Sequence, residues 1–442
     1  MSTIDPAICA DTVSSRHTPQ TGKPSRLAFY LLSIGVVWAL VAFLSFCVMW
    51  VQWQMSAPGI SPISGDFISF WTGGRMALAG HAAAAYDEIE HFFAELALHH
   101  DPDLGYVAFF YPPFFLLLCM GFALLPYFSA LCLWLATTCA LYAAALRALV
   151  PKSLRERERI WLLFLGYPAV MINAGFGQNG FLSTALFGGA AIFLDRQPAL
   201  AGLCLGCLAY KPQLGVIVPL ALAVAGRWRC FAAAAATVVT LAILSTLAFG
   251  IGIWPTFVAG TAEAQHNWLE AYNPLYLKFL ISIFGAVRLH DGSLALAYTL
   301  QAAVSVAAVL ALVFALRQRP AGVRSGRAEI AAIAACVPFC SPFLLEYDLI
   351  ILAVPMVWLL SEGLRDGFGR GEGIALVAGY LAPALYKVGP FEYEAEPFVI
   401  VAAGLLFAVV LRRMMQAPAL PRPTAGLEPA VPIGPLQQRF AT

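Results

Sequence analysis

Long apolar runs, separated by short charged or Pro/Gly-rich joints, follow one another along most of the chain. The first run, residues 27–53, exceeds the roughly 20 residues that an α-helix needs to cross a bilayer. No short apolar core with a small-residue cleavage site follows its polar leader, so we interpret the run as a retained span and not as a signal peptide. Further runs lie at residues 109–126, 127–149, 160–176, 180–194, 198–211, 213–226, 230–251, 293–316, 328–343, 349–363, 373–388 and 397–411.

These runs predict an all-α polytopic membrane protein. The composition agrees, because 60% of the 442 residues are hydrophobic and 12% are charged, against roughly 25% charged in an ordinary soluble domain. Several runs are shorter than a full span, which predicts tilted or partial helices. The chain has no repeat, P-loop or dinucleotide fingerprint, so we expect no cofactor and no nucleic-acid partner.

Most Lys and Arg residues fall at alternate joints, at residues 16–26, 147–159, 196, 227–229, 317–327, 365–370 and beyond 412. The positive-inside rule assigns these joints to the cytoplasm. The chain then divides into a cytoplasmic segment (1–26), one transmembrane domain (27–411) and a disordered, Pro-rich cytoplasmic tail (412–442). Two large segments, 54–108 and 252–292, fall on the extracytoplasmic side.

Thirteen crossings would place the two termini on opposite sides, so one run is expected not to cross. The best candidate is "FFYPPFFLLLCMGFALLP" (109–126), whose prolines suit a re-entrant or interfacial segment that lines a cavity. About twelve spans then remain. A register error within 160–194 is the alternative.

The first outer segment carries Asp66 in "SGDFISFWTGGRMALAGHAAAAYD" (64–87). Asp66 precedes a predicted helix, 67–79, that Gly80 can end, so its carboxylate is either a helix cap or a functional acid. A second predicted helix, 87–100, is amphipathic. It places Ile89, Phe92, Phe93 and Leu96 on one face and Glu88, His91, Glu95 and His99 on the other. We interpret it as an interfacial helix.

The cations expected outside are Arg75, Lys211, Lys278, Arg288 and Lys387. Each faces a low-dielectric boundary, so each needs an anionic partner or a water-filled cavity. Lys211 lies in "YKPQ", where Pro212 forces a turn at membrane depth, and its alternative role is snorkelling to the outer interface. An outer cavity with a carboxylate and several cations suggests binding of an anionic lipid head group.

Other polar residues have a structural and a functional interpretation. Gln178 and Asn179, in "FGQNG", could bind sugar hydroxyls or cap a helix end. His266 and Glu270 lie in the second outer segment near Trp268 and Tyr272, which could stack on a sugar or anchor at the interface.

Three patterns raise the question of a metal or redox site. "HHDPD" (99–103) contains an acid-x-acid pattern, and His91, Glu95 and His99 have a spacing that could hold a divalent ion. A turn and an exposed polar helix face explain them as well, and we expect no metal. Cys204 and Cys207 lie in an apolar run, where Cys behaves as a small hydrophobe.

The chain resembles glycosyltransferase family 87, a branch of the multi-pass GT-C fold. The resemblance lies in "GDFISFWTGGRMALAGHAAAAYD", "YPPFFLLLCMGFALLP", "GFGQNGFLSTALFGGAAIFLDRQPALAGLCLGCLAYKPQ" and "SPFLLEYDL", in the family's order over roughly residues 64–360. It implies a GT-C-like bundle of about twelve transmembrane helices in a bacterial inner membrane. It also implies transfer of a hexose, by family expectation mannose, from a polyprenyl-phosphate donor to a lipid or glycan acceptor.

The family's catalytic base is an aspartate in the first extracytoplasmic loop, and Asp66 matches it. Departure of a lipid phosphate needs cations, for which Arg75 and Lys211 are the first candidates and Arg288 and Lys278 the second. Candidate sugar or acceptor contacts are Gln178, Asn179, His266, Tyr347 and Asp348. Many relatives carry a histidine near 341–349 that this chain lacks, and Asp348 is the expected substitute.

Two other function classes stay open. A transporter or flippase of a lipid-linked anion would also need outer cations, although matching broken helices in two halves are not evident. An inactive relative within an assembly is the third possibility. The residues do not identify the sugar, the acceptor, the linkage or the oligomeric state.

Overall fold

A computed structural model describes residues 65–99, 105–157, 160–271, 274–319, 325–387 and 396–416. The predicted first span (27–53), the segments before and after the bundle, and Tyr272 lie outside these residues. The described part is helical without β-strands, and one isolated bridge joins Leu280 and Leu345. The first half contains α2 (Phe67–Leu78), η2 (Ala82–Tyr86), α3 (Glu88–His99), α4 (Pro113–Ala123), α5 (Tyr127–Leu149), α6 (Lys152–Arg157), η3 (Ile160–Phe164), α7 (Pro168–Phe176), α8 (Gly180–Phe193), α9 (Pro198–Cys207), η4 (Leu208–Tyr210), α10 (Pro212–Gly215) and α11 (Val218–Val224).

The second half contains α12 (Trp228–Phe249), α13 (Ile253–Ala264), η5 (Gln265–Glu270), α14 (Pro274–Leu277), α15 (Ile283–Leu289), α16 (Leu294–Gln318), α17 (Gly326–Cys340), η6 (Glu346–Leu352), α18 (Ala353–Asp366), α19 (Glu372–Lys387) and α20 (Glu396–Met415). Glycines with positive φ end several of these helices, among them Gly80 at φ 85° after α2, as the sequence predicted.

Five helices in the described part are long and apolar enough to cross a membrane: Tyr127–Leu149, Trp228–Phe249, Leu294–Gln318, Glu346–Asp366 and Pro397–Met415. Shorter apolar helices, such as Gly180–Phe193, would measure about 21 Å at 1.5 Å per residue, less than the roughly 30 Å of a bilayer core. Pro and Gly at the joints interrupt these shorter runs. The polytopic membrane class is confirmed, and the number of twelve spans stays a prediction.

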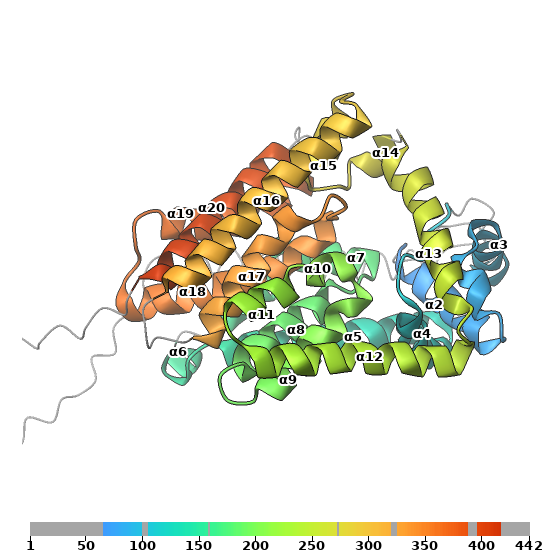
Figure 1. Ribbon diagram of the computed structural model, residues 1–442, viewed down its shortest axis with the longest axis horizontal. Helices are drawn as coiled ribbons and strands as arrows, with labels where there is room; N and C mark the ends of the chain where they lie inside the picture. Colours follow the sequence, from blue (N-terminus) through green and yellow to red (C-terminus); the bar gives the residue numbers. More distant parts are fainter. Residues whose placement is uncertain are drawn as a thin grey trace, which may run out of the picture.

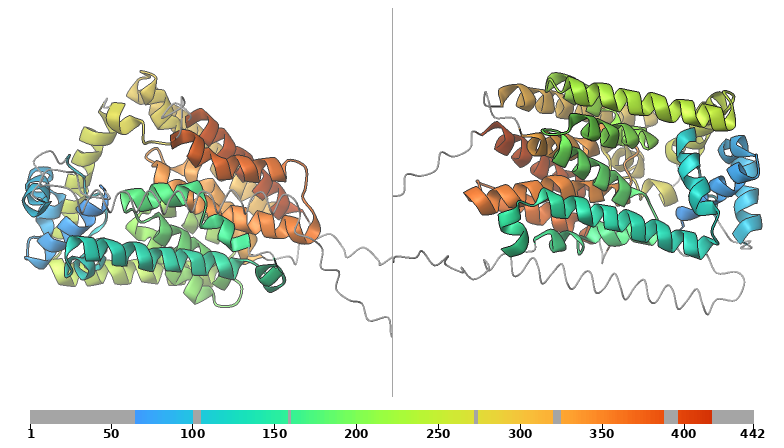
Figure 2. Two further views of the ribbon diagram at one scale, coloured as in Figure 1. Left: turned by 180° about the vertical axis from the view of Figure 1, so that it is seen from behind. Right: turned by 90° about the horizontal axis from the view of Figure 1, so that it is seen from below.

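One layer of the bundle consists of α5, α8, α9 and α12, packed in that order. Figure 2 shows α5 and α12 on opposite sides of this layer in its right-hand view. The contact between α9 and α12 depends on Gly202 and Gly206, where an added Cβ would lie 2.5 Å from the Cys230 carbonyl oxygen and 2.7 Å from that of Ala234. Small residues four apart thus bring these two helices together, as they commonly do in membranes.

A second group consists of α16 to α20, with α17 packed against α16, α18 and α20 (Figure 1). The Ser325 hydroxyl accepts a hydrogen bond from the Ala328 backbone and begins α17, whose residues from Ala328 to Pro338 are all buried. A helix that is apolar on every side belongs in the interior of a bundle. Helix α17 also packs on α8 and thereby joins the two groups.

The end of the molecule at the right of Figure 1 is built from α2, η2, α3, α4 and α13. Helix α4 packs along α2. At 11 residues it is too short to cross a bilayer alone. The re-entrant interpretation of 109–126 remains a prediction.

Helix α3 is amphipathic, but it buries polar residues and exposes apolar ones, the reverse of a helix on the surface of a soluble protein. His91 and Glu95 are fully buried, whereas Ile89 and Phe93 are 66% and 62% exposed. The expected exposed polar face is therefore wrong for His91 and Glu95. At a membrane boundary, lipid can cover the apolar face while the polar face packs on protein.

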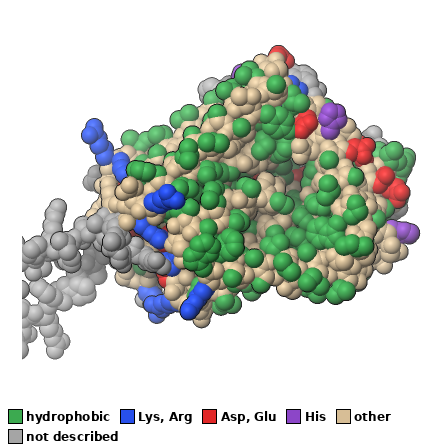
Figure 3. Space-filling view, in the orientation of Figure 1, with side chains coloured by type: hydrophobic (Ala, Val, Ile, Leu, Met, Phe, Trp, Pro, Cys, Tyr) green, Lys and Arg blue, Asp and Glu red, His purple; other side chains and the backbone are tan. Residues whose placement is uncertain are grey.

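On the face of the molecule drawn in Figure 3, the charged side chains are unevenly distributed between the two ends. Figure 3 shows most Lys and Arg side chains at the left end and most Asp, Glu and His side chains at the right end. Such a segregation is what the positive-inside rule expects of a membrane protein. Which end faces the cytoplasm stays a prediction.

Candidate active site

Asp66 immediately precedes α2, yet its side chain does not cap that helix. The residue has helical backbone angles (φ −80°, ψ −22°), unlike the extended N-cap geometry that lets a side chain reach the first helical N–H groups. Its Oδ2 instead accepts a hydrogen bond from Gln178 Nε2 at 2.8 Å, and its backbone N–H donates to the Phe176 carbonyl at 3.2 Å. The helix-cap interpretation of the Asp66 carboxylate is wrong.

Gln178 lies in a break between α7 and α8. Gly177 ends α7 at φ 65°, a conformation that favours glycine. The Asn173 side chain bridges the break, since its Oδ1 accepts from the Gly180 N–H at 2.7 Å and its Nδ2 donates to the Gln178 carbonyl at 3.2 Å. The Tyr111 hydroxyl donates to Gln178 Oε1 at 3.2 Å, which leaves Nε2 facing Asp66.

The carboxyl of Asp66 has a perturbed acidity. Burial raises its pKa from the ordinary 3.8 to about 6. The hydrogen bond from Gln178 and the charge of Lys211 lower this pKa, whereas the charges of Asp348 and Glu95 raise it. A carboxyl that titrates near pH 6 suits a general base better than an ordinary aspartate does.

Lys211 and Asp348 form a buried ion pair behind this carboxylate. Lys211 Nζ lies 2.6 Å from Asp348 Oδ1, and the two side chains are 2% and 0% exposed. Nζ also donates to Asn179 Oδ1 at 3.2 Å and lies 4.8 Å from the centre of the Tyr347 ring. Because Lys211 is enclosed, the snorkelling alternative is wrong, and the lysine contacts Asp348 rather than an open surface.

A cavity of about 150 Å³, here called the aromatic cavity, opens beside Asp66. Gln178 and Tyr347 line it, whereas Asn179, Lys211 and Asp348 do not. Its described lining consists of Asp66, Ser69, Phe70, Tyr106, Val107, Ala108, Phe110, Tyr111, Phe176, Gln178, Trp268, Leu269, Tyr276, Phe279, Leu345, Glu346 and Tyr347.

Arg75 lies near the opposite end of α2 from Asp66. Their separation of nine positions corresponds to about 13 Å of helix, and the guanidinium lies 5.7 Å from the centre of the Trp71 ring. Its Nη1 donates to the Ala123 carbonyl at 3.5 Å. The structure therefore does not bring Arg75 to the aromatic cavity.

Neither of the other two predicted phosphate ligands lines the cavity. Lys278 Nζ is 5.3 Å from the centre of the ring of Phe279, which lines the cavity. Arg288 donates from Nη2 to the Glu270 carbonyl at 3.0 Å and from Nη1 to the Gly292 carbonyl at 2.9 Å. Arg288 thus holds backbone, whereas Lys278 lies beside a residue that lines the cavity.

His266 is 75% exposed and lies 3.5 Å, Nδ1 to Oε2, from Glu270. It does not line the aromatic cavity, although its neighbour Trp268 does. Both residues were candidates from the sequence, and η5 presents the tryptophan, not the histidine, to the cavity.

The buried polar pair of α3 supports another part of the cavity wall. His91 Nε2 lies 3.2 Å from Glu95 Oε1, and the Val107 N–H donates to Glu95 Oε2 at 3.2 Å. His91 Nδ1 contacts the Ala85 carbonyl at 3.1 Å. Within the part of the chain that the structure describes, no three His, Cys, Asp or Glu side chains come together as a metal site would require. The side chain of His99 and the rest of "HHDPD" lie outside the described part.

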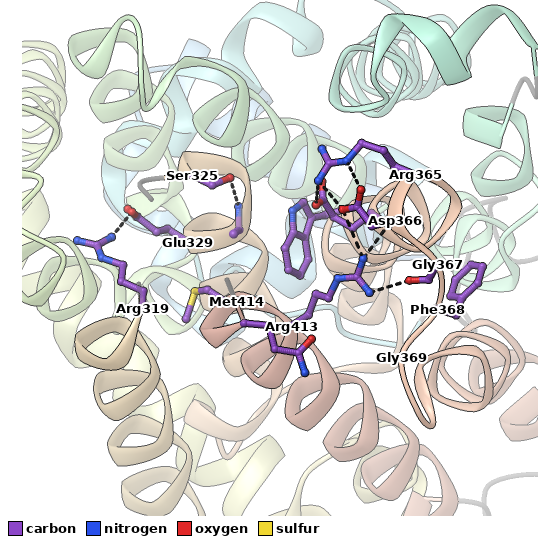
Figure 4. A pocket seen from close by; sticks show the side chains of 14 residues that line it. Arg319, Ser325, Glu329, Arg365, Asp366, Gly367, Phe368, Gly369, Arg413 and Met414 are labelled. Carbon is purple, nitrogen blue, oxygen red and sulfur yellow. Dashed lines mark hydrogen bonds and ion pairs between the residues drawn. The ribbon is translucent and has the colours of Figure 1, made fainter. Parts of the chain in front are cut away.

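A second cavity, of about 370 Å³, lies among α16, α17, α18 and α20 (Figure 4). Three arginines line it, and each faces a carboxylate: Arg319 bonds Glu329, and Arg365 and Arg413 lie 2.7 Å and 3.7 Å from Asp366. The charges of this cavity are thus largely balanced within the protein. We interpret these ion pairs as a structural network that joins the ends of helices.

Several residues at or near the aromatic cavity escaped sequence reasoning. Tyr106, Tyr111 and Tyr276 line the cavity, and Asn173 staples the helix break. The sequence could have indicated Asn173, because it is an amide in an otherwise apolar run, and the structure buries it. There was little reason in the sequence to select the tyrosines, since aromatic residues are common at membrane interfaces for other reasons.

Comparison with known proteins agrees with the resemblance found in the sequence. A model of glycosyltransferase family 87 matches residues 109–342, which is more than half of the 442 residues. Searches of curated proteins and of solved structures found no match. The matched range runs from α4 to α17 and includes Tyr111, Gln178, Lys211 and Trp268. The chain therefore belongs to glycosyltransferase family 87.

Proposed function

We propose that this protein transfers a hexose, by family expectation mannose, from a polyprenyl-phosphate donor to a hydroxyl group of a lipid or glycan acceptor. Asp66 is the general base, and the reaction takes place at the extracytoplasmic face. The observation that carries the proposal is the Asp66 carboxyl, which lines the aromatic cavity and whose pKa of about 6 keeps it ionised at neutral pH. The transmembrane bundle holds this site at the membrane, in which the lipid chain of the donor dissolves.

The reaction is a single displacement. The acceptor oxygen attacks the anomeric carbon, the bond from that carbon to the phosphate oxygen breaks, and the electron pair leaves with the phosphate. The acceptor proton moves to Asp66 in the same step. Attack on the face opposite the leaving group inverts the anomeric configuration.

Gln178 positions the base. It donates to Asp66 Oδ2 at 2.8 Å, and in the described part of the chain Oδ1 accepts no hydrogen bond. Oδ1 is therefore the oxygen to which we assign the proton transfer. Because the break between α7 and α8 fixes Gln178, the carboxylate is oriented before substrate binds.

Lys278 is the cation that we assign to the departing phosphate, because it lies beside the cavity wall at Phe279. The negative charge that develops on the leaving group is stabilised by a cation placed in advance. Arg288 acts indirectly in this proposal, since it holds the backbone of η5. Lys211 acts through its charge on Asp66 and does not contact the phosphate.

A donor panel tests the proposal. Purified protein in detergent is incubated with radiolabelled polyprenyl-phosphate hexoses and a lipid extract, with and without chelator, and the anomeric configuration of the product is determined. Transfer with inversion from a lipid-phosphate donor supports the proposal. Transfer from a nucleotide sugar instead, or a product that retains configuration, contradicts it. Absence of transfer across a broad panel would favour a transporter of lipid-linked anions.

A further inference from the structure

Trp268 lines the aromatic cavity, and the proposed reaction assigns it no role. It lies on η5, a π-helical turn. Such turns are rare in proteins, and those that occur are often found at functional sites. Glu270 Oε1 accepts from Gln265 Nε2 at 2.8 Å, and Arg288 Nη2 donates to the Glu270 carbonyl at 3.0 Å. These bonds hold the turn that presents Trp268 to the cavity.

Two tyrosines complete this wall. The centre of the Trp268 ring lies 5.0 Å from that of Tyr276 and 5.5 Å from that of Tyr106. The Tyr276 hydroxyl donates to the Tyr106 carbonyl at 3.2 Å, which ties the two segments together. Three connected rings thus form a rigid apolar surface in the cavity that Asp66 also lines.

The Trp268 indole carries a donor that needs a partner. Its Nε1 is buried and has no acceptor among the residues that the structure describes. Buried donors in native proteins are nearly always paired, with protein, water or ligand. A hydroxyl oxygen of a ligand in the cavity supplies such an acceptor.

Size and charge indicate the kind of ligand. A cavity of about 150 Å³ resembles in size one known to hold a single benzene ring. Asp66 and Glu346 line the cavity, and no described lining residue is Lys, Arg or His. An anionic phosphate is poorly placed beside a carboxylate in such a site, because no cation of the lining compensates its burial. An uncharged ring with hydroxyl groups fits these surroundings.

We propose that the aromatic cavity is the acceptor subsite and holds one uncharged sugar ring of the acceptor against Trp268, with the indole N–H bonded to a ring oxygen. This rests on the proposed function, in which the acceptor hydroxyl meets Asp66. The donor phosphate lies outside the aromatic cavity. The protein therefore discriminates against acceptors whose reacting ring carries a carboxylate.

Kinetics of Trp268→Phe give the first test, because this variant keeps an aromatic ring and loses the N–H. The acceptor KM should rise roughly tenfold, as for loss of one hydrogen bond, and the donor KM should stay within about twofold. Trp228→Phe is the matched control, since Trp228 lies on α12 outside the cavity and is 61% exposed. An unchanged acceptor KM in Trp268→Phe, or a rise in the donor KM alone, would overturn the assignment.

Photolabelling gives a second test that does not require turnover. Protein in lipid nanodiscs is labelled with an octyl hexoside that carries a diazirine on its ring, with octyl hexoside or octyl hexuronide as competitor. We expect the label on peptides with Tyr106, Trp268 or Tyr276, and at least tenfold weaker competition by the hexuronide. Label elsewhere, or equal competition by both compounds, overturns the subsite. If transfer is absent but labelling follows this pattern, the proposed reaction fails while the ring site stands.

Discussion

Gln178 Nε2 donates to Asp66 Oδ2 at 2.8 Å and joins the start of α2 to the break between α7 and α8, across 112 positions of the chain. The bond connects the residue that the family resemblance marks as catalytic to a break in the helical layer. The Asp66 carboxylate is thus oriented by a residue from a separate element. The behaviour of Asp66 should therefore depend on Gln178.

The activity of the wild-type protein should fall in acid. In the proposed reaction Asp66 is the base and must be ionised, and its pKa of about 6 places the acid limb of kcat/KM near that pH. Below it, kcat/KM should fall about tenfold per pH unit, as expected for one essential ionisation. A pH profile with saturating donor checks this. An acid limb near pH 4, the range of an ordinary aspartate, contradicts the burial of this carboxyl.

Replacing Gln178 should move that limb upward. The hydrogen bond from Gln178 stabilises the carboxylate and lowers its pKa, so Gln178→Met should raise the Asp66 pKa further, by about one unit. Activity should then be weak at pH 6 and recover largely at pH 8 to 9. Asn267→Leu, which removes an exposed amide on η5, serves as control. A limb that stays in place would show that Gln178 does not act on Asp66.

The pair of Lys211 and Asp348 should matter for stability. Lys211→Met leaves Asp348 buried without its counter-ion and should cost about 3–5 kcal/mol of unfolding free energy. The double variant Lys211→Met/Asp348→Asn should recover most of this loss. Unfolding titrations in mixed micelles measure both. Arg365→Met, from a pair exposed by 53% and 31%, should cost below about 1 kcal/mol. A mild effect of Lys211→Met on stability with a large rise in donor KM would instead favour a phosphate contact.

Glu95 should tolerate an amide but not truncation. Gln at this position can still accept from the Val107 N–H and donate to His91 Nε2, so Glu95→Gln should change stability by less than about 1 kcal/mol. Glu95→Ala leaves the buried His91 Nε2 and the part-buried Val107 N–H unpaired and should cost about 2–4 kcal/mol. Glu90→Ala, on the exposed side of the same helix, is the matched control. Equal stability of Glu95→Ala and Glu90→Ala would contradict the role assigned to this pair.

Local features of the fold were predictable from the sequence. Three of the five long helices follow predicted apolar runs of full length (127–149, 230–251 and 293–316), whereas the runs 349–363 and 397–411 were predicted shorter than the helices Glu346–Asp366 and Pro397–Met415. Helix α2 begins and ends within one residue of the predicted helix 67–79. The break at "FGQNG" was visible because glycines interrupt the apolar run there. Such features depend on neighbouring residues, which the sequence displays directly.

Tertiary pairings were not predictable in the same way. Asp348 pairs with Lys211 across 137 positions, and no local pattern indicates that a lysine expected at the outer interface will be enclosed. The prediction of an exposed polar face on α3 was wrong for another reason. Its amphipathic pattern defines two faces, but at a membrane boundary either face can be covered, by lipid or by protein.

Transfer by Asp66→Asn, compared with wild type, tests the central claim most directly. The change is nearly isosteric and keeps an oxygen that Gln178 can bond. Asp291→Asn is the matched control, because Asp291 has φ 60°, which asparagine tolerates well. With the active donor and equal thermal unfolding, Asp66→Asn should lose roughly 10²–10⁴-fold in kcat, and Asp291→Asn should match wild type. Transfer by Asp66→Asn at the wild-type rate would contradict the assignment of Asp66 as the base.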